Sequence, residues 1–121
     1  MVARIKIPTS EIDECYSYGR CMFLATALHR KFGLEIQCVM ESDSNGEFIS
    51  HAWVVENGMI IDINGKNTPE MNDYVDDSST IITGLSEQLL LSVIHRYRQV
   101  NPHDWEIRVN EAMLIVNEYF S

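Results

Sequence analysis

Three side chains suited to nucleophilic chemistry follow one another along the sequence: Cys21, His51 and Asp62. A thiol becomes a nucleophile when an imidazole accepts its proton, and a carboxylate can hold that imidazole in the required tautomer. These residue types suffice to transfer an acyl group from an amide through a thioester. We interpret them as a candidate catalytic triad, with Cys21 as nucleophile, His51 as base and Asp62 as the residue that orients the base.

A helix predicted over residues 20–32 positions Cys21. Its apolar residues recur at helical spacing on one face, and Gly33 is the expected stop. The residues on this face are Cys21, Leu24, Ala25, Leu28 and Phe32. Cys21 falls in the first turn, where free N–H groups and the helix dipole favour a thiolate.

A tight hairpin turn at Asn57-Gly58 relates His51 to Asp62. A two-residue turn there puts Trp53 opposite Asp62, and His51 lies two residues from Trp53 on the same face. His51 and Asp62 are then diagonal neighbours, with backbones roughly 7–8 Å apart, which their side chains can span. The pattern therefore predicts a His51–Asp62 pair.

The other segments predict short elements around this site. Strands are expected at 2–7 (an edge strand), 34–41, 48–55 and 59–63, and a polar surface loop at 66–80. Further helices are expected after Ser10 as N-cap, near Ser86, and after Asn101-Pro102. The inner face of the helix near Ser86 is expected to hold Leu85, Leu89, Leu90, Val93, Ile94 and Tyr97, and that of the last helix Trp105, Val109, Ala112, Met113, Val116 and Phe120. The alternation at 105–109 leaves a strand there as the alternative.

Together these elements indicate an α+β fold: a nucleophile helix packed against a small antiparallel sheet, with additional C-terminal helices. At 121 residues the chain fits a single domain, 1–121. Its apolar runs are too short for a membrane span and its start lacks a signal-peptide core, so we expect a cytoplasmic protein without a membrane partner.

Cysteine usage and charge narrow the possible partners. Three cysteines without dense spacing indicate no disulfide framework. The net charge of −9 disfavours nucleic acid and suits a solvated surface or a basic protein partner. Cys15, Cys21, Cys38 and His29 lack the spacing of a zinc site, so we expect no metal and no cofactor. His95 and His103 are expected on the surface.

Three motifs resemble the transglutaminase-like (papain-like) cysteine protease superfamily. Its nucleophile helix is similar to Gly19-Arg20-Cys21 followed by Ala25, Leu28 and Phe32-Gly33. Its histidine strand is similar to Ser50-His51-Ala52-Trp53-Val54. Its aspartate strand is similar to Gly58-Met59-Ile60-Ile61-Asp62. The resemblance covers about residues 15 to 65. It implies acyl-enzyme chemistry on amides, with Cys21, His51 and Asp62 in the roles above. The papain-type oxyanion glutamine has no counterpart, because Cys15 stands six residues before Cys21.

The substrate expected from these features is an amide in a peptide, a protein side chain or a small molecule. Tyr18 and Trp53 flank the candidate triad and are predicted to contact substrate, although packing alone also explains both residues. A second hypothesis is a catalytically inactive acidic binding module or inhibitor that docks on a basic partner, because a buried helical cysteine is often only a small hydrophobe. A third is a structural subunit, which predicts an exposed apolar patch.

Overall fold

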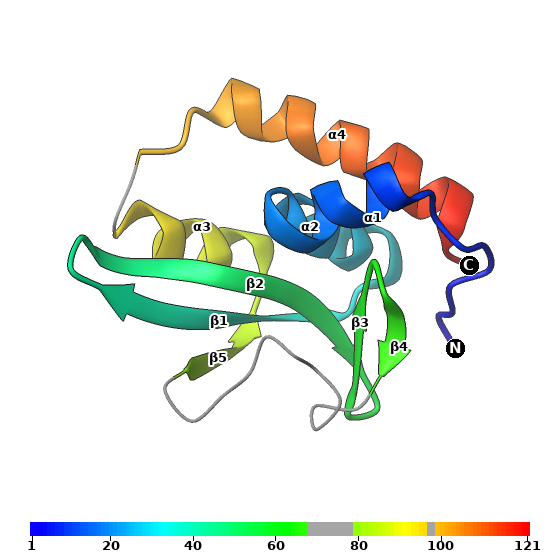
Figure 1. Ribbon diagram of the computed structural model, residues 1–121, viewed down its shortest axis with the longest axis horizontal. Coiled ribbons are helices and arrows are strands. Elements are labelled where there is room, and N and C mark those ends of the chain that lie inside the picture. The colour runs from blue at the N-terminus through cyan, green and yellow to red at the C-terminus, as the bar shows by residue number, and fades with distance from the viewer. Residues whose placement is uncertain (68–78, 97–98) are drawn as a thin grey trace.

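The computed structural model describes residues 1–67, 79–96 and 99–121, apart from the side chains of Tyr18 and Asn67. In these ranges the fold is α+β, as predicted, with helices on one side of an antiparallel sheet (Figure 1). The helices are α1 (Ser10–Tyr18), α2 (Cys21–Phe32), α3 (Glu87–His95) and α4 (Pro102–Tyr119). The strands are β1 (Glu35–Asp43), β2 (Gly46–Glu56), β3 (Met59–Asp62), β4 (Gly65–Asn67) and β5 (Thr80–Leu85). None of these helices is long and apolar enough to cross a membrane.

The sheet has the order β4-β3-β2-β1-β5, and each neighbouring pair is antiparallel. The turn between β2 and β3 has positive φ at Asn57 (52°) and Gly58 (80°), as an Asn-Gly hairpin turn requires. It pairs Glu56 with Met59 and Val54 with Ile61, which is the predicted register. The helix predicted over 20–32 is also confirmed, and Gly33 ends it with a φ of 70°.

Helix α2 lies between the sheet and α4 (Figure 1). Burial consequently extends beyond the single predicted face to Met22, Thr26 and Ala27. Thr26 is accommodated because its hydroxyl donates a hydrogen bond to the Met22 carbonyl at 2.9 Å. A helix buried on two sides holds its first residue, Cys21, in a fixed position.

The two C-terminal helices begin where their caps predict. Ser86 caps α3 and Asn101 caps α4, whose side-chain oxygen accepts from the backbone N–H groups of His103 and Asp104. The alternative strand at 105–109 is therefore wrong. The inner face predicted for α3 is confirmed at Leu90, Val93 and Ile94 but wrong at Leu89, which is 51% exposed. Tyr97, also predicted on this face, lies outside the described residues.

Several predicted boundaries need correction. Residues 2–7 do not join the sheet as an edge strand. Instead, Arg4 forms an isolated bridge with Phe120, beside backbone hydrogen bonds that join Ala3 to Ser121. Thr9 rather than Ser10 caps α1, since the Thr9 hydroxyl accepts from Ile12 N–H.

The predicted loop at 66–80 is partly wrong as well. Its first residues belong to β4 and its last to β5, while 68–78 lie outside the described residues. Strand β5, which ends at the buried Leu85, was not predicted.

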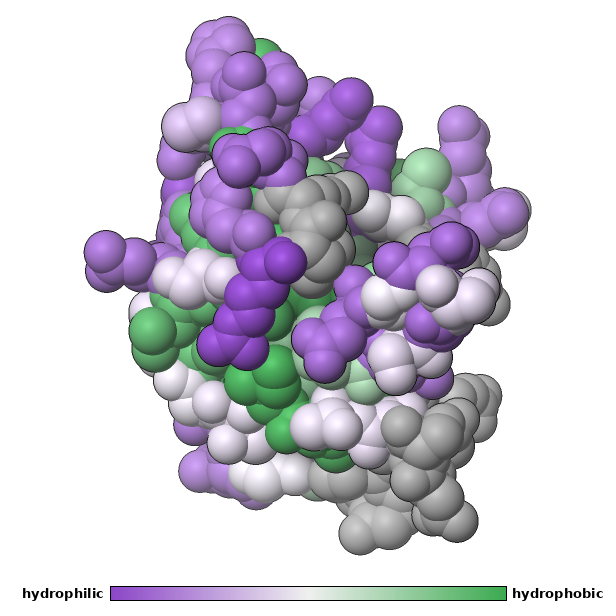
Figure 2. All heavy atoms as spheres, turned by 90° about the vertical axis from the view of Figure 1, so that its left-hand side faces the viewer, coloured by the Kyte–Doolittle hydropathy of each residue, from purple (hydrophilic) through white to green (hydrophobic). Residues whose placement is uncertain are grey.

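Hydrophilic side chains cover much of the face in Figure 2, with hydrophobic ones gathered in a band across its middle. The main core lies between the helices and the sheet. A smaller cluster of Val39, Trp53 and Ile60 is separate from it. Cys21 belongs to the main core, and the Trp53 ring of the smaller cluster packs beside His51.

Candidate active site

Cys21 is the first residue of α2 and is 6% exposed. Arg20 occupies the N-cap position without a side-chain capping bond. In contrast, α1, α3 and α4 are capped by Thr9, Ser86 and Asn101. The N–H groups at the start of α2 therefore have no capping side chain as acceptor, which suits binding of a developing negative charge.

His51 follows an irregularity in strand β2. Val39 pairs with His51 and Met40 with Ile49, so Ser50 is an extra residue on β2. Such a bulge bends a strand and changes the direction of neighbouring side chains. No glycine or proline marks this position, so the sequence pattern did not predict the bulge.

The predicted pairing of His51 with Asp62 is present. Nε2 of His51 lies 2.9 Å from Oδ2 of Asp62 in a buried contact. The other carboxylate oxygen of Asp62 accepts a hydrogen bond from Asn64 N–H at 2.9 Å. His51 is 0% exposed and Asp62 is 2% exposed, so little solvent screens this pair. Both carboxylate oxygens are thereby fixed, and the imidazole is fixed with them.

The Cys21 thiol is the second group that acts on the His51 ring. Burial lowers the pKa of His51, but the hydrogen bonds to Asp62 and Cys21 and the charges of these groups outweigh it and raise the pKa to about 9. The structure thus brings the three residues together, with the imidazole next to both the thiol and the carboxylate. When Nε2 donates to Asp62, Nδ1 is the nitrogen left to exchange a proton with the thiol.

Trp53 packs beside the imidazole. The centroids of the His51 and Trp53 rings are 5.7 Å apart with planes tilted by 46°, and the indole N–H donates to Gln37 Oε1 at 3.2 Å. Trp53 is 1% exposed, so its ring restricts the orientation of the His51 imidazole. Its predicted contact with substrate stays a prediction. So does that of Tyr18, whose side chain lies outside the described part.

The other cysteines occupy different environments. Cys38 is completely buried, and burial together with the nearby Cys21 raises its pKa to about 11. Cys15 is exposed, and all three cysteines are free. Nδ1–H of His29 donates to the Leu34 carbonyl at 2.7 Å. Among the described residues no group of metal-ligating side chains is found.

Arg4 is a part of the site that sequence reasoning missed. Its guanidinium donates a hydrogen bond to the carbonyl of Ile63, the residue after Asp62, at 2.9 Å. No local signal marks Arg4, because the two partners are distant in sequence.

Comparisons with known proteins provide no further guide to this site. No protein-family model matches the chain, and neither a curated protein nor a solved structure matches it significantly.

Proposed function

We propose that the protein is a cysteine-dependent hydrolase or acyltransferase that acts on an amide bond, with chemistry of the transglutaminase-like class. The observation that carries this proposal is the arrangement around His51. The imidazole is held by Asp62 at 2.9 Å, and the Cys21 thiol is a second polar neighbour of the ring among the described residues. This chemistry needs no cofactor.

In the first step His51 takes the proton of the Cys21 thiol, and the sulfur attacks the carbonyl carbon of the amide. The resulting imidazolium, stabilised by Asp62, then gives that proton to the departing amine as the C–N bond breaks. The acyl group remains on sulfur as a thioester. Water or a second amine then gives a proton to His51 and attacks the thioester. The C–S bond breaks, an acid or a new amide is released, and His51 passes the new proton to the sulfur of Cys21.

The start of α2 suits the negative oxygen that forms during each attack. Its first-turn N–H groups lack a capping side chain, and the helix dipole adds a partial positive charge there. We propose that the backbone N–H of Cys21 donates to the oxyanion. One such donor typically contributes about 10²–10³-fold to the rate.

Burial of the triad favours a narrow point of access. Cys21 has the largest exposed fraction of the three residues, at 6% against 0% for His51 and 2% for Asp62. We propose that an extended peptide, a protein side-chain amide or a small amide reaches the sulfur end of the triad. Hydrolysis, deamidation and cross-linking share the thioester and differ only in leaving group and acceptor.

The first experiment is iodoacetamide labelling from pH 5 to 9, with each cysteine followed by peptide mass. Cys21 should be labelled rapidly near pH 6, whereas His51→Ala should slow this reaction at least tenfold. His95→Ala is the matched control, because His95 is exposed on α3. A panel of peptide and side-chain amides is then assayed with wild type and Cys21→Ser.

Slow labelling of Cys21 that is indifferent to His51→Ala would contradict the proposal. That result would instead favour the second hypothesis, an inactive acidic binding module. Rapid labelling without turnover of any amide would retain the thiolate–imidazolium pair and exclude the amides that were tested.

A further inference from the structure

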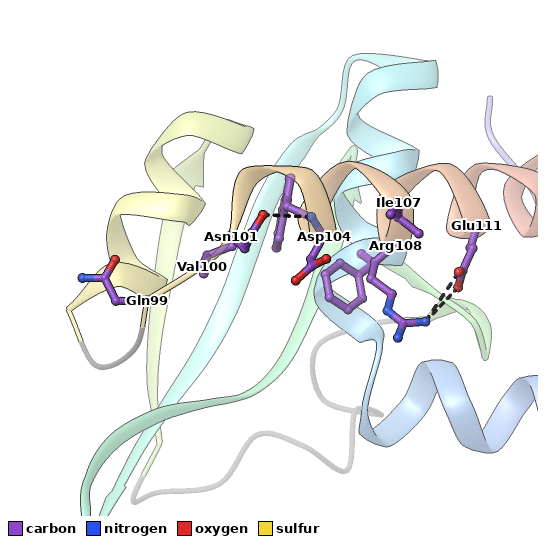
Figure 3. A pocket seen from close by; sticks show the side chains of 9 residues that line it. Gln99, Val100, Asn101, Asp104, Ile107, Arg108 and Glu111 are labelled. Atoms are coloured by element: carbon purple, nitrogen blue, oxygen red, sulfur yellow. Dashed lines mark hydrogen bonds and ion pairs between the residues drawn. The ribbon is translucent and has the colours of Figure 1, made fainter.

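Two cavities lie beside α4, at the margin of the core. One, of about 470 Å³, is lined by Phe23, Gln99, Val100, Asn101, Asp104, Trp105, Ile107, Arg108 and Glu111. The other, of about 270 Å³, is lined by residues of α1 and α4 together with Arg20. Glu111 lines both cavities, so they adjoin, and the two together are here named the α4 groove. Figure 3 shows Asp104, Arg108 and Glu111 projecting from the same side of α4.

The floor and walls of the α4 groove are partly apolar. Ile107 is 42% exposed and Leu114 is 69% exposed, although α4 already buries a complete apolar stripe against the core. Phe23 and Trp105 form an aromatic pair at one end of the groove, with ring centroids 5.2 Å apart. Ile107 and Leu114 lie about two helical turns apart on one side of α4, with Glu111 between them, and the described residues leave both exposed.

The charge of the α4 groove is negative. Its cations, Arg20 and Arg108, both bind Glu111, at 3.1 Å and 3.3 Å. Glu11 and Asp104 also line the groove and form no ion pair within the described ranges. The described lining of the α4 groove therefore holds three carboxylates against two guanidinium groups, and any occupant meets apolar side chains flanked by the carboxylates of Glu11 and Asp104.

We propose that the α4 groove binds a cationic amphipathic segment of a partner protein. Leucine or phenylalanine side chains of that segment would cover Ile107 and Leu114, and its lysines or arginines would lie against Glu11 and Asp104. A second copy of this chain is a poorer occupant, because each copy carries a net charge of −9. The inference does not depend on the proposed chemistry of Cys21.

The test uses a peptide of leucine and lysine, about 15 residues long, whose leucines recur at helical spacing. Binding is measured by fluorescence anisotropy of the labelled peptide, and its position by NMR shift mapping on the whole chain. Wild type should bind it, more weakly as salt rises, with shifts at Ile107 and Leu114. A leucine–glutamate peptide of the same pattern should not bind.

Surface variants locate the interaction. Leu114→Asp and Ile107→Asp should each weaken binding about tenfold or more, and Asp104→Asn should reduce its salt dependence. Leu89→Asp is the matched control, because Leu89 is 51% exposed on α3 and lies outside the groove. Circular dichroism confirms that each variant is folded.

Three results would overturn the proposal. One is absence of peptide binding, the second is equal weakening by Leu89→Asp, and the third is shifts that avoid α4. Sedimentation supplies a further check, since a wild-type dimer that Leu114→Asp converts to a monomer would assign the groove to a second copy.

Discussion

Arg4 and Ile63 are joined by a hydrogen bond of 2.9 Å although 59 positions separate them in the sequence. The Arg4 guanidinium also packs over Gly65, where an added Cβ would lie 3.5 Å from its carbon. Gly65 pairs with Asp62 across the β3–β4 turn. The N-terminal segment thus holds the turn that carries the carboxylate bound to His51.

Replacing Arg4 should therefore loosen the His51–Asp62 pair. Arg4→Ala should lower the free energy of unfolding by about 1–2 kcal/mol, because the Ile63 carbonyl loses its partner. It should also broaden or shift the NMR signal of the His51 Nε2 proton. Arg4→Lys, which still donates a hydrogen bond, should partly restore both. Lys6→Ala, which breaks the exposed ion pair with Glu118, is the control, and an equal change in the His51 signal there would contradict the prediction.

The stability of the protein should depend on pH through His51. The folded state raises the pKa of His51 from 6.5 to about 9, so its contribution is complete below pH 6.5 and is lost as pH rises toward 9. The loss should be on the order of 3 kcal/mol. Urea unfolding between pH 6 and 9 measures it, with His51→Asn expected to flatten the profile. These measurements use the Cys38→Ala variant as background, because deprotonation of Cys38 would also change the stability at alkaline pH. A stability that does not depend on pH in this background, with His51 intact, would refute the prediction.

Asp62→Asn should separate the effect of the Asp62 charge on His51 from the effect of its packing against His51. The amide has nearly the same size but no charge, so the pKa of His51 should fall, as a histidine NMR titration would show. If the proposed acyl transfer occurs, kcat should fall by about 10²–10⁴-fold. Asn64→Ala keeps the backbone N–H that binds Asp62 and should leave the titration of His51 nearly unchanged.

Cys38 should resist modification in the folded protein. It is 0% exposed and its pKa is raised to about 11, so both access and thiolate are lacking at pH 8. Iodoacetamide should label it at least about 100-fold more slowly in buffer than in concentrated urea, as followed by peptide mass. Comparable rates under the two conditions would show that the sheet opens locally around β1.

Two glycines distinguish backbone strain from packing. Gly33→Ala should destabilise the protein by about 1 kcal/mol, because φ is 70° there and the added Cβ meets nothing within 4 Å. Gly19→Ala is the matched change. Its φ is −121° and its Cβ would make only an ordinary contact with the Cys15 carbonyl. Urea unfolding of the two variants should separate them clearly, and equal losses would point to packing instead of strain.

Local chemistry explains which parts of the fold were predictable. The Asn57-Gly58 turn determines the register of β2 against β3, and that register places His51 near Asp62. The periodicity of 20–32 and its glycine stop determine α2. Each of these features depends on residues close together in sequence, so one chain suffices to predict them.

The parts that were missed depend on distant partners. Strand β5 forms by pairing with β1, far along the chain, and its own pattern of exposure does not alternate. The bulge beside His51 and the Arg4 contact likewise depend on tertiary structure. The wrong assignment of Leu89 has a similar cause. Helical periodicity gives the width of an apolar face, but it does not show which residues at the margin of that face are covered by neighbouring elements.

The pairing of residues 3–5 with 119–121 also has a consequence for folding order. These backbone hydrogen bonds close a loop that contains all the described helices and strands, so the entropy lost in closing it is offset only after the helices and the sheet have formed. During synthesis, Arg4 emerges before α4, so its segment can be anchored only after α4 is present. Asp62 therefore acquires this support late, and under the proposed chemistry we expect the Cys21 thiol to become reactive only in the last stage of folding.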